Sequence, residues 1–287
     1  MLRVFVCCAA LLFSTLTVSA QAKFPPESRL KTIAGTKTVK IAYRADATPY
    51  SFVNDRKEPV GYTIDLCRMV VSSLEKQLGI QPIKIEWVPV TVQTRFSTVA
   101  AGKADMECGS STITLGRMKE VDFSNLVFVE STGVLVAKAS NFQSFAGMAG
   151  KKIAVIGGTT NESAVRDHIR VRKIDVTLVP VKDREEGVDA LESGKVDGFA
   201  SDKLLIVGAK MKQPDALIML PDDLSMEPYA IVLPRGDWAF RLAVNTGLAQ
   251  IYRTGAILEV YKQWFGQIGL RPGLLLEATY ALGSLAD

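Results

Sequence analysis

The sequence contains one passage twice. Residues 88–105 read VPVTVQTRFSTVAAGKAD, and residues 179–197 read VPVKDREEGVDALESGKVD. Both copies run from VPV through an amphipathic stretch to GK-x-D and an apolar strand, with one residue of slippage. One explanation is chance, or two ordinary strand–helix–strand units. The other is a chain of two similar lobes, each of which ends a strand at a shared site.

The pattern around both copies predicts an α/β fold. Residues 39–43, 82–90 and 104–109 are expected to be strands, and a helix from Gly61 to Gly79 keeps its apolar residues on one face. A second set of strands and helices follows between residues 151 and 210. Strands separated by helices of this length favour parallel pairing in each lobe.

Two extended segments divide the chain into domains. They lie near residues 130–134 and 227–231, and two strands that cross between lobes make a natural hinge. We therefore predict that residues 23–130 plus 232–287 form lobe 1 and that residues 131–231 form lobe 2. The cleft between the lobes is the expected ligand site.

The N-terminus predicts export. Residues 1–22 contain one early arginine, an apolar run and small residues before two candidate cleavage points, after Ala20 or Ala22. An uncleaved anchor is the alternative, although the apolar run is short for a membrane span. The formal net charge of +4 is spread evenly along the chain, which argues against a nucleic-acid partner.

Two cysteines, Cys67 and Cys108, remain outside the predicted signal peptide. They lie on a predicted helix and a predicted strand of the same lobe. In an oxidising compartment both a disulfide and a pair of buried thiols fit this pattern.

The repeat itself indicates two half-sites. Alignment of the two GK-x-D glycines places Ser110 opposite Asp202, each just past a strand end where α/β folds bind ligands. Ser110, Thr112 and Arg117 lie within eight residues and make either a carboxylate receptor or a polar turn with a surface arginine. Asp202 is a candidate partner for an ammonium group, or the cap of the next helix, or both.

Further candidates lie at predicted loop and helix ends. IGGTTNE places Thr159 and Thr160 at a helix N-terminus, either as anion ligands or as part of a capped turn, and it is neither a dinucleotide fingerprint nor a P-loop. Arg44 and Arg95 are candidate anion ligands or surface charges. Tyr50 would cover the apolar part of a ligand or belong to the core.

Signs of catalysis are few. The one histidine, His168, sits mid-helix between arginines, and we expect it at the surface. The sequence has no Ser-His-Asp set, nucleophile elbow or metal-ligand cluster. We therefore expect neither an enzyme nor a cofactor.

Taken together, the motifs resemble the periplasmic solute-binding proteins of polar amino-acid ABC importers, known as family 3. The resemblance covers residues 39–266 and rests on TPYSFVNDRKEPVGYTIDLC, GKKIAVIGGTTNESAVR, ALESGKVDGFASD, EPYAIVLPRGD and YKQWFG. It implies a type II two-lobed periplasmic-binding-protein fold that closes on a free amino acid. It also implies a periplasmic monomer that docks on a membrane permease.

The segment ECGSST and the spacing from Arg44 to Pro49 are most similar to the glutamate/aspartate-binding branch. That resemblance implies an α-carboxylate site, an ammonium site and a side-chain carboxylate site. Arg117 and Thr112 would hold the α-carboxylate together with the Thr160 turn. Asp202 would hold the ammonium group. Arg44 and Arg95, with help from Ser110, would face the side-chain carboxylate.

The sequence departs from that branch at two positions. Arg184 stands where the branch usually has histidine, and Val92 stands where it often has serine. Arg184 can still pair with an acidic side chain, but its length reshapes the pocket. A sensor of the same fold and an enzyme similar to cyclohexadienyl dehydratases are the alternative functions.

Overall fold

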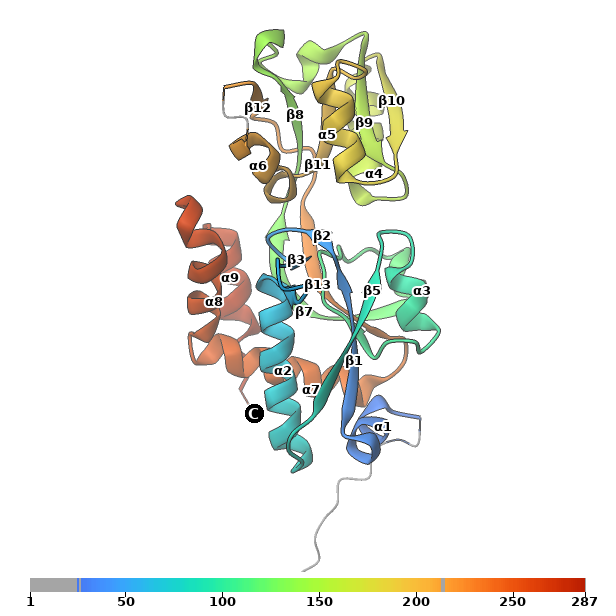
Figure 1. Cartoon of the computed structure of the whole chain (residues 1–287), viewed down its shortest axis with the longest axis vertical. Coiled ribbons are helices and arrows are strands. Elements are labelled where there is room, and N and C mark those ends of the chain that lie inside the picture. The colour runs from blue at the N-terminus through green and yellow to red at the C-terminus, as the bar shows by residue number, and fades with distance from the viewer. Residues whose placement is uncertain (1–24, 26, 213–214, 287) are drawn as a thin grey trace, which may run out of the picture.

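The structure is a computed structural model that describes residue 25, residues 27–212 and residues 215–286. The predicted signal peptide, residues 1–22, lies outside the described residues. Figure 1 shows two lobes stacked along the long axis of the molecule and joined by extended segments. This arrangement matches the predicted two-lobed α/β fold.

Lobe 1 is built on a sheet of order β5-β1-β6-β13-β7. β1 pairs in parallel with β5 and β6, whereas β13 is antiparallel to β6 and β7. The strands of this sheet are β1 (Thr38–Arg44), β5 (Lys84–Val90), β6 (Met106–Glu107), β7 (Val121–Glu130) and β13 (Glu227–Pro234). A small second sheet contains β2 (Asp46–Ala47), β3 (Ser51–Val53) and β4 (Pro59–Val60).

The helices of lobe 1 are α1 (Arg29–Thr36), α2 (Tyr62–Leu78), α3 (Arg95–Ala100), α7 (Trp238–Arg253), α8 (Ala256–Phe265) and α9 (Leu274–Gly283). Alternate residues of β13 point to opposite faces of the sheet, as the pleat of a strand requires. Ile231 packs with α2 and α7, and Val232 packs with α3. The chain therefore returns to lobe 1 after lobe 2.

Lobe 2 repeats this plan with a sheet of order β10-β9-β11-β8-β12. Its strands are β8 (Thr132–Ala137), β9 (Lys151–Ile156), β10 (Val176–Val181), β11 (Gly198–Asp202) and β12 (Leu217–Met219). β9 is parallel to β10 and β11, and β8 is antiparallel to β11 and β12. Its helices are α4 (Thr160–Arg172), α5 (Arg184–Glu192) and α6 (Lys203–Lys212).

The sequence repeat has a structural basis in both lobes. Both GK-x-D glycines adopt the left-handed backbone, with φ of 69° and 71°. The Asp105 carboxylate accepts a hydrogen bond from the backbone N–H of Lys40 on β1 at 2.7 Å, and Asp197 accepts one from Lys152 on β9 at 2.9 Å. Equivalent aspartates therefore anchor β1 in lobe 1 and β9 in lobe 2, and β1-β5-β6 corresponds to β9-β10-β11.

The hinge contains two crossings of the chain. Ser131 alone separates β7 in lobe 1 from β8 in lobe 2, and residues 220–226 connect β12 to β13. Glu130 and Glu227 are direct partners in the β7–β13 ladder. The predicted lobe boundaries remain predictions, but residues 227–230 already pair with β7 in the sheet of lobe 1.

A disulfide links a helix of lobe 1 to the end of one of its strands. Cys67 of α2 and Cys108, one residue beyond β6, form a disulfide within lobe 1. Across the described residues, we find no helix with both the length and the apolar character needed to cross a membrane.

Candidate functional site

The two lobes contact each other where the repeat brings its strand ends together. The hydroxyl oxygens of Thr112 in lobe 1 and Thr160 in lobe 2 lie 3.4 Å apart. Arg184 of lobe 2 forms an ion pair with Asp46 of lobe 1 at 3.3 Å. Val92 of lobe 1 also belongs to an apolar cluster whose other members lie in lobe 2. The lobes are therefore closed on each other in this structure.

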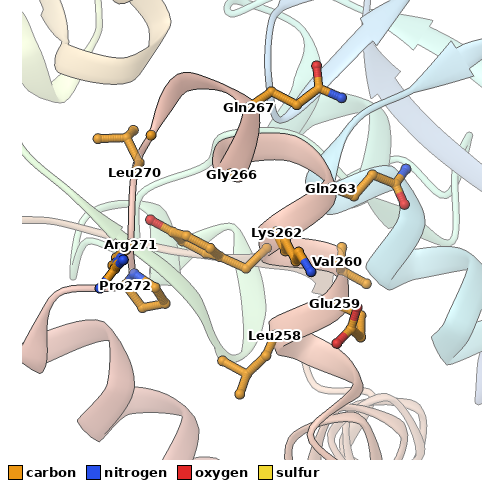
Figure 2. A pocket seen from close by; sticks show the side chains of 12 residues that line it. Leu258, Glu259, Val260, Lys262, Gln263, Gly266, Gln267, Leu270, Arg271 and Pro272 are labelled. Atoms are coloured by element: carbon orange, nitrogen blue, oxygen red, sulfur yellow. The ribbon is translucent and has the colours of Figure 1, made fainter.

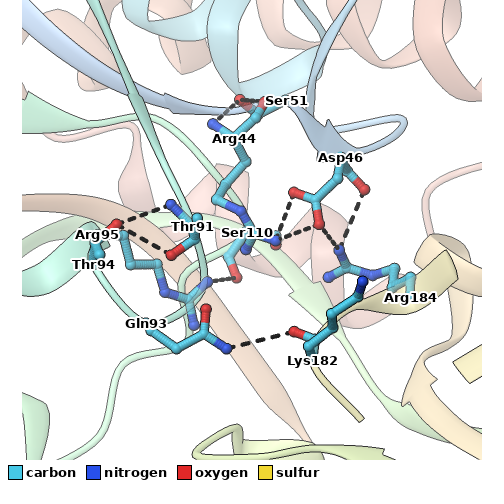
Figure 3. A network of polar contacts seen from close by, with 10 residues as sticks. All are labelled: Arg44, Asp46, Ser51, Thr91, Gln93, Thr94, Arg95, Ser110, Lys182 and Arg184. Carbon is cyan, nitrogen blue, oxygen red and sulfur yellow. Dashed lines mark hydrogen bonds and ion pairs between the residues drawn. The ribbon is translucent and has the colours of Figure 1, made fainter. Parts of the chain in front are cut away.

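One end of this interface holds what we call the distal cluster, made of Arg44, Asp46, Arg95, Ser110 and Arg184. Figure 3 shows the three arginine side chains converging from both lobes. Arg44 is 1% exposed and Arg95 is 4% exposed, which excludes the alternative that they are surface charges. Arg95 Nη1 donates to the Ser110 carbonyl at 3.3 Å.

Several donors of the distal cluster are buried without a hydrogen-bond partner among the described residues. They are Arg44 Nε and Nη1, Arg95 Nε, Arg184 Nε and Ser110 Oγ. Buried polar groups are normally paired, because an unmet donor away from water costs about 1–3 kcal/mol. A set of unpaired guanidinium N–H groups is the donor geometry that binds a carboxylate.

The electrostatics of the cluster agree with that interpretation. Burial lowers the pKa of Arg95 to about 9, although Glu107 opposes this effect. Burial, followed by repulsion from Arg44, also lowers the pKa of Arg184. Both shifts mean that the charged guanidinium is disfavoured as the structure stands. An added anion would stabilise it.

Glu107 is a buried acid behind the distal cluster that the sequence reasoning missed. Its Oε2 accepts a hydrogen bond from Ser111 at 2.8 Å, and Oε1 is unpaired among the described residues. A Cβ atom at position 109 would collide with this carboxylate and press on the Arg44 stem. Gly109 is therefore needed for the close approach of Glu107 to Arg44.

The other end of the interface holds what we call the proximal cluster, made of Thr112, Arg117, Thr160 and Asp202. Arg117 Nη1 donates to the Thr112 carbonyl at 2.7 Å, and its guanidinium lies 4.7 Å from the centre of the Phe96 ring. The Thr112 hydroxyl donates to Glu227 at 2.7 Å. The Arg117 guanidinium and the Thr112 and Thr160 hydroxyls therefore lie close together where the two lobes meet.

Asp202 is 5% exposed and ends β11. It accepts a hydrogen bond from the Asn161 amide at 3.1 Å, and no lysine or arginine of the described chain forms an ion pair with it. Burial, then repulsion from Glu227, raises the pKa of Asp202, while Arg184 lowers it. In the first turn of α6, the backbone N–H of Leu204 donates a hydrogen bond to the Glu130 carboxylate at 3.4 Å. Asp202 is therefore a buried carboxylate suited to receive a cation.

Two of the predicted ligand-binding residues, Tyr50 and Thr159, have side chains that already bond to other parts of the protein. Tyr50 is fully buried among aromatic rings of lobe 1, and its hydroxyl donates to Glu130 at 2.6 Å. The Thr159 hydroxyl accepts from the Glu162 amide and donates to the Ile156 carbonyl, so it caps α4. For both side chains the structure shows the structural alternative rather than a group left free for a ligand.

The sequence reasoning also missed three polar residues at this interface. Asn161 lies in the quoted GGTTNE turn, Glu227 opens the quoted EPYAIV strand, and Asp46 lies in the loop after Arg44. Glu227 is 2% exposed and accepts from Ser225 at 2.6 Å as well as from Thr112. Each residue was inside a recognised motif, but no spacing rule marked it as part of the site.

A large surface pocket lies elsewhere in lobe 1. Its volume is about 920 Å³. Its lining residues lie between positions 258 and 272, on α8 and the segment that follows it (Figure 2). None of the predicted site residues lines it. Within the described chain, no group of three or more histidine, cysteine or acidic residues has the geometry of a metal site.

Comparison with known proteins gives this geometry a context. A family model described as bacterial extracellular solute-binding proteins, family 3, matches residues 39–267. An L-glutamate/L-aspartate-binding protein of Pseudomonas aeruginosa is 33% identical over 241 residues, covering 83% of this chain and 80% of that protein. A glutamate/aspartate import solute-binding protein of Escherichia coli is 29% identical over 240 residues, with the same coverage.

Among solved structures, an ancestral amino acid-binding protein described as a precursor of cyclohexadienyl dehydratase superposes with a TM-score of 0.72. It is 27% identical, and the match covers 83% of this chain and all of that one. The matching relatives named above are binding proteins, one of them an import protein.

Proposed function

The chain belongs to the bacterial extracellular solute-binding proteins of family 3, and from that premise we propose that it captures a free acidic amino acid, L-glutamate or L-aspartate. Closure of the two lobes traps the ligand, and the closed form delivers it to an ABC importer. The relatives that bind glutamate and aspartate span most of this chain, which supports the assignment.

The observation that carries the proposal is the distal cluster. Three buried or nearly buried arginines from two lobes keep N–H groups unpaired around Ser110. Burial of such charges is unfavourable unless an anion is matched to them. A side-chain carboxylate of the ligand supplies that anion, and a neutral amide would leave part of the charge uncompensated.

The proximal cluster would hold the part common to all amino acids. Arg117 and the Thr160 hydroxyl would receive the α-carboxylate, and so would the Thr112 hydroxyl once its hydrogen turns away from Glu227. Asp202 would receive the α-ammonium group. Asp202 carries a raised pKa because burial and Glu227 disfavour its charge. A bound ammonium group relieves that penalty.

Closure follows from how these groups are divided between the lobes. Arg117 comes from lobe 1 and Asp202 from lobe 2, so a zwitterion binds both only when the lobes meet. A ligand shifts a conformational equilibrium by its difference in affinity for the two states. The bridging contacts supply that difference, and the hinge at Ser131 and residues 220–226 accommodates the movement.

The remaining parts of the proposal concern setting and partners. The protein would be exported to the periplasm after cleavage of residues 1–22, act as a monomer, and dock on a membrane permease. Transport is favoured over sensing because an import protein is among the relatives that span most of the chain. We propose no catalytic role, and one structural neighbour is itself described as an amino acid-binding protein, a precursor of cyclohexadienyl dehydratase.

The test is isothermal titration of the mature protein, unfolded and refolded to remove any carried ligand, with each of the twenty amino acids and with prephenate. Binding of L-glutamate or L-aspartate at least tenfold tighter than of L-glutamine is the expected result. Tighter binding of a neutral or basic amino acid would refute the acidic specificity while leaving the family intact. Release of an aromatic product from prephenate would refute the absence of catalysis.

A further inference from the structure

We propose that Asp46 is a specificity-determining residue that acts as a built-in counter-ion of the distal cluster and limits how much negative charge the pocket accepts. The inference rests on the proposed function, because it concerns the same site. It assigns a role to a residue that the sequence motifs left unmarked.

The geometry of Asp46 differs from that of an ordinary surface acid. Both of its carboxylate oxygens lie within 2.7 Å of Arg44 Nη2, and Oδ2 lies 3.3 Å from Arg184 Nη1. Arg184 Nη1 also donates to the Asp46 backbone carbonyl at 3.3 Å. One carboxylate therefore binds a cation from each lobe, as Figure 3 shows.

Asp46 contacts only some of the nitrogen atoms of the Arg44 and Arg184 guanidinium groups. Asp46 occupies Nη2 of Arg44 and Nη1 of Arg184, whereas Nε and Nη1 of Arg44 and Nε of Arg184 stay buried and unpaired. The Asp46 side chain is 44% exposed, so it lies on the solvent side of the cluster. The arginine nitrogen atoms that Asp46 does not contact are buried.

The charges of the distal cluster and Glu107 explain why the Asp46 carboxylate affects the choice of ligand. Arg44, Arg95 and Arg184 carry three positive charges, and Asp46 and Glu107 carry two negative ones when ionised. The remainder matches a ligand group with a single negative charge. Without Asp46, the same three arginines would favour an anion more strongly over a neutral group of the same shape.

The position of Asp46 is fixed by its local structure. It begins β2, which pairs with β3 so that Asp46 faces Phe52 in the ladder. Ser51, the first residue of β3, also accepts a hydrogen bond from the Arg44 amide at 3.0 Å. The hairpin therefore holds the carboxylate and the arginine in one register, and a counter-ion of this kind is preorganised.

The experiment measures the ratio of affinities for L-glutamate and L-glutamine, which have the same shape and differ in the charge and hydrogen-bond donors of the distal group. Wild type, Asp46→Asn and Asp46→Ser are titrated by calorimetry after thermal unfolding confirms that each is folded. Asp55→Asn is the matched control, because Asp55 is an exposed acid of the same lobe. We expect the ratio to shift toward glutamate by about tenfold in both Asp46 variants and not in the control, since a partly exposed charge is partly screened.

An unchanged or reversed ratio in the Asp46 variants would overturn the inference, whichever ligand wild type prefers. If wild type prefers glutamine but the ratio still shifts toward glutamate, the acidic specificity fails and the role of Asp46 stands. If neither wild type nor any variant binds either amino acid, the acidic specificity and the role of Asp46 both fail.

Discussion

The substitution Asp202→Asn should have opposite effects on ligand binding and on stability. Asp202 is buried, accepts a hydrogen bond from Asn161, lies beside the Tyr229 hydroxyl and has no ion-pair partner among the described residues. Asparagine keeps the shape and can still accept that bond through its amide oxygen. The change therefore removes the negative charge and little else.

Binding should weaken strongly. Removing one member of a buried charge pair costs about 2–5 kcal/mol, because the other charge is left unpaired away from water. That cost corresponds to a loss of affinity of about 30-fold to several thousandfold at 25 °C. The loss should be similar for all amino acids that bind, since the α-ammonium group is common to them.

The ligand-free protein should instead become more stable. Burial and Glu227 raise the pKa of Asp202, so its ionised form destabilises the native state at neutral pH. A gain of about 1 kcal/mol would raise the Tm of a chain of this size by about 2–4 °C. The penalty is fully present above the raised native pKa and vanishes below the unfolded pKa of about 3.9, so the gain should disappear near pH 3.

Calorimetric titration and thermal unfolding from pH 3 to pH 8, with refolded protein, measure both effects. Asp55→Asn is the control for loss of one acidic charge in an exposed place. A variant that binds within fivefold of wild type would refute the ammonium role of Asp202. A variant that binds weakly but is also less stable at pH 7 would refute the electrostatic argument.

Three further predictions follow from the same structure. Arg44→Ala should weaken L-glutamate at least tenfold more than L-glutamine in titrations, and equal losses would remove Arg44 from side-chain recognition. The Cys67→Ser, Cys108→Ser double variant should lose about 4 kcal/mol in denaturant unfolding, because the disulfide closes a loop across a sequence separation of 41. Glu130 has a pKa raised to about 7, mainly by burial. The unfolding free energy should therefore fall by up to about 3 kcal/mol as the pH rises from 4.5 to 7, and Glu130→Gln should flatten that slope.

The fold was accessible to sequence reasoning because its signals are periodic and repeated. The helix predicted to begin at Gly61 and end at Gly79 occupies Tyr62–Leu78, and Gly79 takes the left-handed conformation of a C-cap. The two copies of GK-x-D predicted the correspondence of the lobes. The hairpins β2 to β4 were missed because strands of two or three residues carry no periodicity.

The site was accessible only in part, for a related reason. Arg44 and Arg95 could be placed at strand and helix ends, but nothing in the sequence distinguishes a buried arginine from an exposed one. Thr159 and Thr160 are adjacent and chemically alike, yet one hydroxyl caps α4 and the other faces lobe 1. Such differences depend on the angle at which two elements meet, which the sequence pattern does not encode.

The division of charge between the lobes explains how a duplicated plan can bind an asymmetric ligand. At the proximal end, lobe 1 supplies the cation Arg117 and lobe 2 supplies the anion Asp202, so the proposed zwitterion would bridge them. At the distal end the polarity is reversed, because lobe 2 supplies the cation Arg184 and lobe 1 supplies the anion Asp46. Asp46 and Arg184 contact each other directly across the interface, whereas no ion pair joins Arg117 to Asp202 among the described residues. In the proposed function, the distal pair would set the charge that the pocket tolerates, and the proximal pair would make closure depend on an amino acid.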